Sequence, residues 1–102
     1  MTAARYSSGN WRVKDGQQQE FIARWREFVE WTKANLSGSN EVVLIQQVSD
    51  PQHFLSFGRW DGQDSIDAWR QSPEFAERLG RCRELCDDFE ANDYELAASF
   101  DK

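Results

Sequence analysis

The sequence predicts a single α+β domain with the element order β-α-β-β-α-β. Three observations support this fold class. A long segment carries apolar residues at helical spacing, two apolar segments with strand character follow it across a turn, and an alternating segment closes the chain. The length of 102 residues allows one hydrophobic core, so residues 1–102 are expected to form one domain.

The first two elements are predicted to be a strand and a long helix. Tyr6 to Lys14 has strand character, and Asp15-Gly16 ends it with a turn signal. Gln17 to Leu36 is predicted to be an amphipathic helix. Its apolar stripe consists of Phe21, Ile22, Trp25, Phe28, Val29, Thr32 and Leu36. Trp25 is central in this stripe and is expected in the core, whereas Trp31 lies off it and is expected to be exposed or at a subunit interface.

Two strands are predicted in the middle of the chain, from Glu41 to Val48 and from Phe54 to Trp60. Both segments are rich in apolar, β-branched or aromatic residues. The residues between them include Pro51 and have the composition of a turn, so the two strands are expected to pair in antiparallel fashion. His53, the only histidine, is predicted to be a solvated residue of this turn.

The last third of the chain is predicted to contain two helices and a closing strand. Asp61 can cap a short helix that reaches Arg70, and Ser72 with Pro73 can start a second helix that runs to about Glu90. The inward stripe of that second helix would be Phe75, Leu79, Cys82, Cys86 and Phe89. Alternation from Tyr94 to Phe100 predicts the final strand. This order indicates a ferredoxin-like antiparallel sheet with its helices on one face.

The charge balance argues against anionic partners. Eighteen acidic and twelve basic residues give a net charge of −6 at pH 7. A negative chain repels phosphate groups, so we expect no binding to nucleic acid or to an anionic membrane. No segment is apolar enough to span a membrane, and Met1 to Asn10 lacks the apolar stretch of a secretory signal. The sequence therefore indicates a soluble, cytoplasmic protein.

Cys82 and Cys86 are the only cysteines. Their spacing places them on one face of the predicted helix, where they are expected to be reduced thiols that fill the core. A zinc site would need two further ligands at suitable spacing, and no histidine or cysteine offers itself. We therefore predict no metal site.

The middle strands predict a homodimer. Their alternate positions are apolar on both faces: Val42, Leu44 and Val48 on one, Val43 and Ile45 on the other. If helices cover one face only, the other exposes a large apolar patch, which soluble monomers generally avoid. A second copy of the same sheet is the simplest cover and gives a two-fold dimer with the sheets face to face.

Several segments together resemble the antibiotic biosynthesis monooxygenase (ABM) family. Val13-Lys14-Asp15-Gly16 is similar to the end of the family's first strand, Phe21 and Trp25 to its first helix, and Phe54 to Trp60 to its third strand. The sequence Ala-Trp-Arg-Gln-Ser-Pro-Glu-Phe from Ala68 to Phe75 is similar to its helix junction. The resemblance covers nearly the whole chain. It implies a dimeric α+β barrel, but it leaves the activity open because the family contains several chemistries.

One branch of the family degrades haem. Its members use an asparagine on the first strand, a tryptophan in the helix junction and a later histidine that binds iron. Trp69 matches the tryptophan, but the histidine position falls at or near Leu79, and Gly9 stands at the asparagine position, with Asn10 beside it expected to point to the other face of the strand. Binding or degradation of haem is therefore disfavoured.

A second branch oxidises polycyclic phenols to quinones with O2 and no cofactor. Trp60 matches a functional tryptophan of its third strand, Ser56 replaces an asparagine, Ile66 stands at a tyrosine position, and Arg81 lies near a functional arginine. This match implies a monooxygenase that acts on an aromatic phenol or a polyketide-like molecule. Such a reaction requires a site that binds a flat apolar ring, stabilises an oxyanion and excludes water. The candidate substrate-binding residues are Trp11, Ser56, Trp60, Trp69 and Arg81.

Core packing explains the same residues without any reaction. Trp60 and Trp69 could be ordinary core side chains, and Trp11, which should face the helices, could line a cavity or fill it. Arg81 could form a surface salt bridge, as could Arg78, with acidic neighbours on the same helix. No side chain is evidently poised as a general base. The alternative function is therefore a non-catalytic dimeric protein that binds a small apolar molecule, and the substrate is not defined by the sequence.

Overall fold

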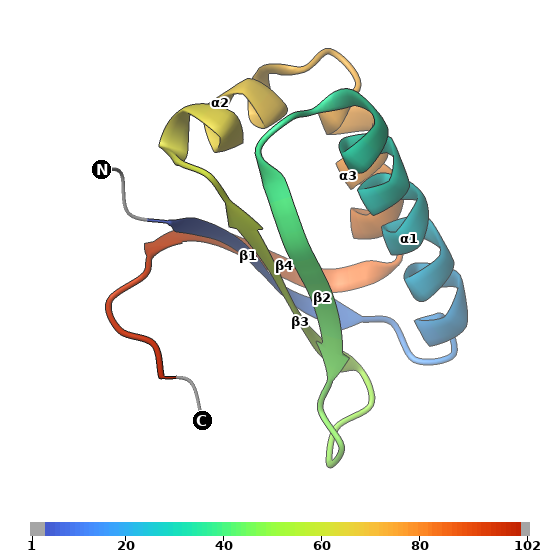
Figure 1. Cartoon of the computed structure of the whole chain (residues 1–102). Coiled ribbons are helices and arrows are strands. Elements are labelled where there is room, and N and C mark those ends of the chain that lie inside the picture. Colours follow the sequence, from blue (N-terminus) through green and yellow to red (C-terminus); the bar gives the residue numbers. More distant parts are fainter. Residues whose placement is uncertain (1–3, 101–102) are drawn as a thin grey trace.

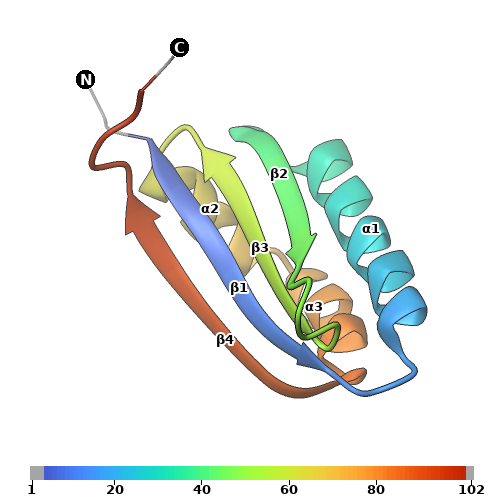
Figure 2. The same cartoon turned by 90° about the horizontal axis from the view of Figure 1, so that it is seen from below.

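The computed structural model describes residues 4–100, which form one four-stranded antiparallel sheet and three helices (Figure 1). The strand order is β2-β3-β1-β4, the arrangement of the ferredoxin-like fold that the sequence predicts. The elements are β1 (Arg5–Val13), α1 (Gln18–Asn35), β2 (Ser39–Gln46), β3 (His53–Trp60), α2 (Gln63–Gln71), α3 (Phe75–Arg83) and β4 (Cys86–Glu95). Figure 2 looks onto the sheet with the helices behind it, so one face is covered and the other is open.

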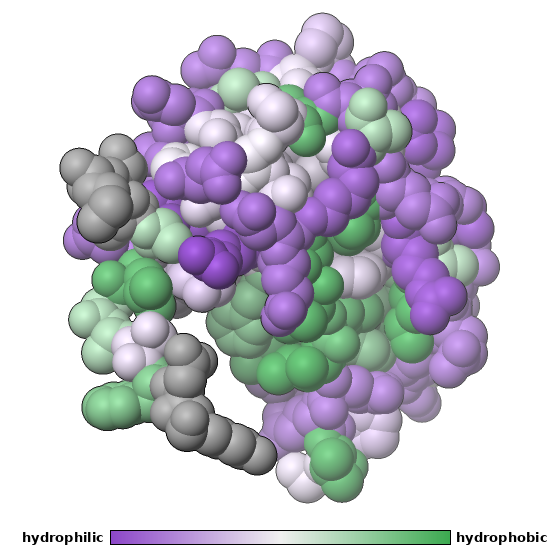
Figure 3. Space-filling model, viewed as in Figure 1, coloured by the Kyte–Doolittle hydropathy of each residue, from purple (hydrophilic) through white to green (hydrophobic). Residues whose placement is uncertain are grey.

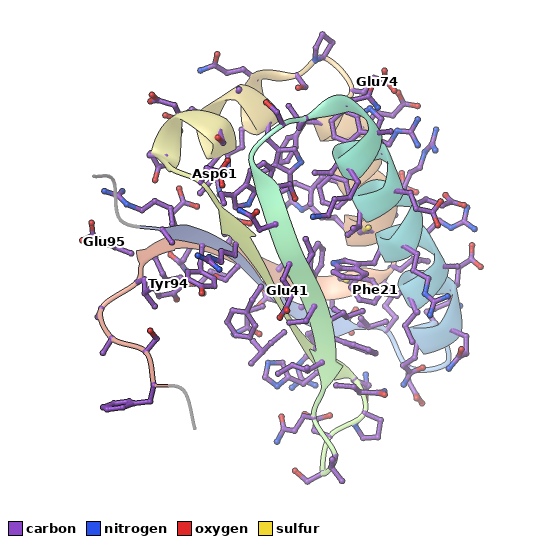
Figure 4. The ribbon with its side chains drawn as sticks, in the orientation of Figure 1. Phe21, Glu41, Asp61, Glu74, Tyr94 and Glu95 are labelled. Atoms are coloured by element: carbon purple, nitrogen blue, oxygen red, sulfur yellow. The ribbon has the colours of Figure 1, made fainter. Side chains whose placement is uncertain are left out.

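The register of β1 and β3 decides which residues face the helices. Trp11 lies opposite Phe54, and Gly9 lies opposite Ser56. These four residues, and every second residue along each strand from them, face the helices. The low exposure of Trp11, Phe54 and Trp60 shows this. Phe21 lies on the side of α1 that faces the sheet (Figure 4). Its ring centroid is 5.1 Å from those of both Trp11 and Phe54. The site-forming strands therefore share one aromatic core with α1.

Trp31 is part of the core, so the prediction that it is exposed or at a subunit interface is wrong. Only 8% of its surface is exposed, and its ring stacks on Phe28 at a centroid distance of 6.3 Å. The reason is α3, which packs beside α1 and widens the buried arc of that helix. The guanidinium of Arg78 on α3 lies 5.9 Å from the Trp31 ring centroid. Trp25, expected in the core, is half-buried and packs against it.

The prediction for the end of the chain is also wrong. Helix α3 ends at Arg83 instead of Glu90, so Cys86 and Phe89 belong to β4. The closing strand is Cys86–Glu95, and residues 96–100 form no regular element. Cys86 to Glu95 pairs along the whole of β1, which satisfies the outer row of backbone groups of that strand. This tertiary pairing outweighs the low strand propensity of the acidic residues in the segment.

Helix α2 starts one residue later than predicted, and helix α3 starts two residues later. Helix α2 begins at Gln63 with Gly62 at its N-cap, and Asp61 instead accepts a hydrogen bond from Asn40 Nδ2 at 3.0 Å. Helix α3 begins at Phe75, because Ser72, Pro73 and Glu74 form the connection between the two helices. The helix junction predicted from the sequence is therefore present, but as a tight turn before the helix.

The open face of the sheet carries an apolar patch, as the alternation of β2 and β3 predicts. Val43 is opposite Phe57, and Ile45 is opposite Leu55. The exposed fractions are 37% for Val43, 51% for Ile45 and 36% for Phe57. Figure 3 shows a hydrophobic area over this part of the sheet. Val48 does not belong to either face, because β2 ends at Gln46 and Val48 is exposed in the following turn.

Candidate functional site: an aromatic cavity between sheet and helices

A cavity lies between the covered face of the sheet and the helices. Its free volume is about 70 Å³, and it is partly open to solvent, so a larger ligand could extend from it. Four of the five predicted site residues line it: Trp11, Ser56, Trp60 and Trp69. Arg81 does not line it. The structure thus brings together residues from β1, β3 and α2 that are far apart in the sequence.

Aromatic rings form the walls of this cavity and hold one another in place. The Trp60 and Trp69 ring centroids are 4.9 Å apart, with 39° between the ring planes. Trp69 also stacks on Phe28 at 5.6 Å and meets the edge of Phe75 at 4.8 Å. Trp11 packs against Phe89 at 4.2 Å on the other side of the cavity. The tryptophans are therefore core residues and cavity walls at the same time, and they present flat apolar surfaces to a ligand.

Three tryptophans of the cavity donate their indole N–H to a hydroxyl group. Trp11 Nε1 donates to Ser56 Oγ, Trp60 Nε1 to Ser7 Oγ, and Trp69 Nε1 to Thr32 Oγ1, each at 3.0 Å. All three hydroxyl groups line the cavity. The indole N–H groups are thus satisfied within the protein. Thr32 Oγ1 in turn donates to the Phe28 carbonyl oxygen at 2.9 Å, so among these three hydroxyls only those of Ser7 and Ser56 have a hydrogen to offer a ligand.

Sequence reasoning missed Ser7 and the glycines beside these pairs, although the sequence contains a signal. The pattern Ser-x-Gly-x-Trp occurs twice, at residues 7–11 and at residues 56–60. A Cβ atom on Gly9 would lie 2.5 Å from Trp11 Nε1, and a Cβ atom on Gly58 would lie 3.2 Å from Ser7 Oγ. Both glycines therefore leave room for an indole–hydroxyl pair on the cavity floor.

Arg81 and the two thiols lie outside the cavity chemistry. Arg81 pairs with Glu77 at 2.8 Å on the exposed surface of α3, and Arg78 pairs at 3.3 Å with Glu74, which precedes that helix. Burial raises the pKa of Cys82 to about 12 and that of Cys86 to about 11, so both thiols are uncharged near neutral pH. Within residues 4–100 no three metal-ligating side chains of the kinds His, Cys, Asp and Glu converge.

The structure shows where the residues lie that were compared with the haem-degrading branch. Leu79 lines the cavity with an apolar side chain, and Gly9 lies on the cavity floor. Asn10 points to the open face, where its Oδ1 is 2.7 Å from His53 Nε2. His53 is the first residue of β3 rather than a turn residue, and its Nδ1 is 2.7 Å from Gln47 Oε1. The histidine is therefore on the side of the sheet away from the cavity.

Arg70 is the only ionisable side chain among the described residues that line the cavity. Its guanidinium forms two hydrogen bonds with Asp93 of β4, at 2.6 and 2.5 Å, and Gln63 Nε2 adds a third contact at 3.0 Å to the same carboxylate. The Arg70 guanidinium keeps the pKa of Asp93 below its usual range, and the carboxylate raises the pKa of Arg70. This pair ties α2 to β4 beside the cavity.

Protonation of Asp93 should loosen this connection. Because the pKa of Asp93 is lowered in the folded state, the pair stabilises the protein above the unfolded-state pKa of about 3.9 and loses this effect as the pH falls through the lower folded-state value. We expect Asp93→Asn to reduce the free energy of unfolding by about 0.5–1 kcal/mol at pH 7 and by progressively less below pH ~4. Urea unfolding at several pH values measures the difference.

Asp88→Asn is the matched control, because Asp88 is an exposed residue of the same strand with no ion pair within residues 4–100. It should leave the stability nearly unchanged. An Asp93→Asn effect of the same size at pH 7 and well below pH ~4 would exclude a role for the charge.

The fold and the cavity define a class of protein: a small ferredoxin-like α+β domain with an aromatic cavity between sheet and helices. The sequence model of the family described as "Antibiotic biosynthesis monooxygenase" matches residues 7–78, and the chain belongs to this ABM family. No curated protein matches the sequence closely enough to count as a relative. No helix within residues 4–100 combines the length and apolar character needed to cross a membrane.

Solved structures share this fold at low sequence identity. SnoaB, a cofactor-independent oxygenase from Streptomyces nogalater, has a TM-score of 0.88 and 14% identity, and the match covers 99% of this chain and 100% of SnoaB. A conserved protein from Methanosarcina mazei has a TM-score of 0.80 and 23% identity, covering 91% of this chain and 92% of that one. Protein SO0527 from Shewanella oneidensis has a TM-score of 0.79 and 13% identity, covering 94% and 93%.

Proposed function

We propose that this ABM protein is a cofactor-independent monooxygenase that oxidises an electron-rich aromatic phenol or polyketide-like molecule with O2. The observation that carries the proposal is the aromatic cavity, in which Trp60 and Trp69 form a wall with ring centroids 4.9 Å apart and serine hydroxyls line the sheet side. Membership of the ABM family and the fold shared with SnoaB, a cofactor-independent oxygenase, support the same conclusion.

The proposed reaction makes modest demands on the protein. The phenol O–H and the ring C–H opposite to it each lose hydrogen, one atom of O2 becomes the new carbonyl oxygen, and the other leaves as water. The substrate supplies all the electrons, so no external reductant is needed. Trp60 and Trp69 would stack on the ring and exclude water, while Ser56 would stabilise the negative charge that develops on an oxygen as the proton leaves. Trp11 would fix the Ser56 hydroxyl through its hydrogen bond.

A homodimer is part of the proposal. The apolar patch formed by Val43, Ile45, Leu55 and Phe57 lies on the open face. Burying such a patch against a second copy removes it from water without closing the cavity, which is on the opposite face. The dimer would therefore stabilise the sheet that positions Ser56 and Trp60.

The second candidate function is non-catalytic binding of a small apolar molecule. It is favoured by the absence of a general base among the described lining residues, where Arg70 is the only ionisable side chain and is engaged by Asp93. In that case the same walls and hydroxyls would bind a ligand without turnover.

Oxygen-dependent turnover distinguishes the two functions. We expect the protein to convert 1-naphthol or 9-anthrol to the corresponding quinone in air, faster than a protein-free control, and to form no product under anaerobic conditions. Trp60→Phe should lower the rate at least about tenfold, because it removes ring surface and the N–H that holds Ser7. Product formation is followed by absorbance and mass spectrometry.

Trp31→Phe is the matched control, since Trp31 is a buried tryptophan that does not line the cavity. Its rate should stay close to that of the unmodified protein. Equal product with and without O2 would refute the oxygenase proposal. Tight binding of these phenols with no product in air would establish the second candidate instead.

A further inference from the structure

The two Ser-x-Gly-x-Trp segments form a nearly two-fold symmetric floor of the cavity. In the antiparallel pairing of β1 and β3, Ser7 is opposite Gly58, and Gly9 is opposite Ser56. Each serine accepts a hydrogen bond from the tryptophan of the other strand, at 3.0 Å in both cases. The local two-fold axis passes between the strands at the Ser8–Phe57 pair. Ser7 therefore occupies the position in the cavity that is symmetric to that of Ser56.

Each of these two serines has a hydroxyl hydrogen that it can donate to a ligand. A serine hydroxyl can accept bonds and donate one. Ser7 Oγ and Ser56 Oγ each accept an indole N–H, and neither donates to an acceptor within residues 4–100. Ser56 is 9% exposed, so water has little access to it. Ser39 Oγ, which also lines the cavity, is buried and has no partner among the described residues. The cavity therefore contains more hydroxyl donors than the described residues use.

Gly9 and Gly58 leave room for the two indole–hydroxyl pairs to form. A Cβ on Gly9 would come within 2.8 Å of Ser56 Oγ, and a Cβ on Gly58 within 3.2 Å of Ser7 Oγ and 3.4 Å of Trp60 Nε1. Serines at diagonal positions of an antiparallel pair are about 7 Å apart. That spacing suits two oxygen atoms on opposite sides of one aromatic ring that lies above the two indole–hydroxyl pairs.

The charge of the residues that line the cavity favours an uncharged ligand. Arg70 is the only ionisable residue among the described residues that line the cavity, and its guanidinium is already paired with Asp93. A permanently anionic ligand would therefore find no free cation among the described lining residues and would have to give up its hydration. Hydroxyl donors and aromatic walls instead favour an uncharged ring with oxygen acceptors.

We propose that Ser7 and Ser56 are a matched pair of hydrogen-bond donors that hold one flat, uncharged ligand by two oxygen atoms on opposite sides of its ring. This inference rests on the proposed use of the cavity as a binding site. It adds Ser7 to that site as a specificity-determining residue and gives each hydroxyl an orienting partner, Trp60 for Ser7 and Trp11 for Ser56.

Binding of simple ethers tests the pair without any oxidation. The probes are 1,4-dimethoxybenzene, which has two opposite acceptors, methoxybenzene, which has one, and 4-methoxybenzoate, which is anionic. Titrations are followed by the indole N–H resonances of Trp11 and Trp60 in two-dimensional NMR spectra. We expect the dimethoxy compound to bind at least about threefold more tightly than methoxybenzene, the effect of one added hydrogen bond, and the anion to bind most weakly.

Serine variants test whether the two hydroxyls cause the preference for a ligand with two oxygen acceptors. Ser7→Ala and Ser56→Ala should each weaken binding of 1,4-dimethoxybenzene by about three- to tenfold and remove its advantage over methoxybenzene. Ser72→Ala is the control, because this half-buried serine on the helix connection lies outside the cavity and should have no effect on binding. Ser7→Thr and Ser56→Thr retain the hydroxyl and should retain the preference, so the test does not depend on the alanine variants being stable.

The outcomes separate this inference from the proposed activity. If Ser7→Ala keeps the full preference for two acceptors, or if 4-methoxybenzoate binds as tightly as the neutral ethers, the paired-donor inference is wrong even when phenols are oxidised. If the ethers show the predicted pattern but 1-naphthol and 9-anthrol are not oxidised, the inference stands and the oxygenase proposal fails.

Discussion

Gly9→Ala should be among the most damaging single substitutions in this protein, lowering the free energy of unfolding by about 3 kcal/mol. The new Cβ would lie 2.5 Å from Trp11 Nε1 and 2.8 Å from Trp11 Cε2 and Ser56 Oγ. The indole is 2% exposed and packed against Phe21 and Phe89, so it cannot move aside without opening the core. Displacing Ser56 instead would leave the indole N–H buried without an acceptor.

Gly58→Ala is the matched control on the symmetric strand. Its Cβ would meet Ser7 Oγ at 3.2 Å and Trp60 Nε1 at 3.4 Å, distances that small shifts can relieve. We expect a loss of about 1 kcal/mol or less. Urea unfolding of both variants, followed by far-UV circular dichroism, measures the difference. If the two variants have the same free energy of unfolding, the close contacts expected for a Cβ at Gly9 do not determine stability, and the explanation is wrong.

The double substitution Ile45→Lys with Phe57→Lys should convert a homodimer into a folded monomer. The two side chains are 51% and 36% exposed in a single subunit, so lysine at these positions should be tolerated by the monomer. In the proposed dimer the same lysines would be buried without partners at the sheet-to-sheet interface. Because an unpaired buried charge costs several kcal/mol, we expect the dissociation constant to rise at least about a hundredfold.

Val48→Lys is the control for this experiment. Val48 is 98% exposed in the turn after β2, outside the apolar patch, and its replacement should leave the dimer intact. Sedimentation analysis at micromolar concentration gives the subunit number for all three proteins. An unmodified chain that sediments as a stable monomer would contradict the dimer proposal, as would a double-lysine variant that remains dimeric.

The first two thirds of the fold could be predicted from the sequence because local patterns there agree with the tertiary structure. Helix α1 (Gln18–Asn35) and strand β3 (His53–Trp60) match the predicted segments within one residue at each end. The end of the chain could not be predicted in this way, because Cys82, Cys86 and Phe89 fit a helical stripe equally well. Their assignment to α3 and β4 depends on pairing with β1, which is a long-range contact.

The site was only partly predictable for a related reason. Trp60, Trp69 and Ser56 were identified through the family resemblance, and the structure places all three at the cavity. Arg81 was identified by the same resemblance only as lying near a functional arginine, and its position on α3 directs it to Glu77 instead. Ser7 could be recognised only when the register of β1 and β3 showed that the two Ser-x-Gly-x-Trp segments face each other.

Isotope labelling tests the central claim, the oxidation of a flat phenol by O2 in the tryptophan-walled cavity. When 9-anthrol is incubated with the protein under ¹⁸O₂, each quinone molecule formed should contain one ¹⁸O atom, and Trp60→Phe should form this product at least about tenfold more slowly. Product without the label, or labelled product formed as fast by Trp60→Phe or without protein, would contradict the account.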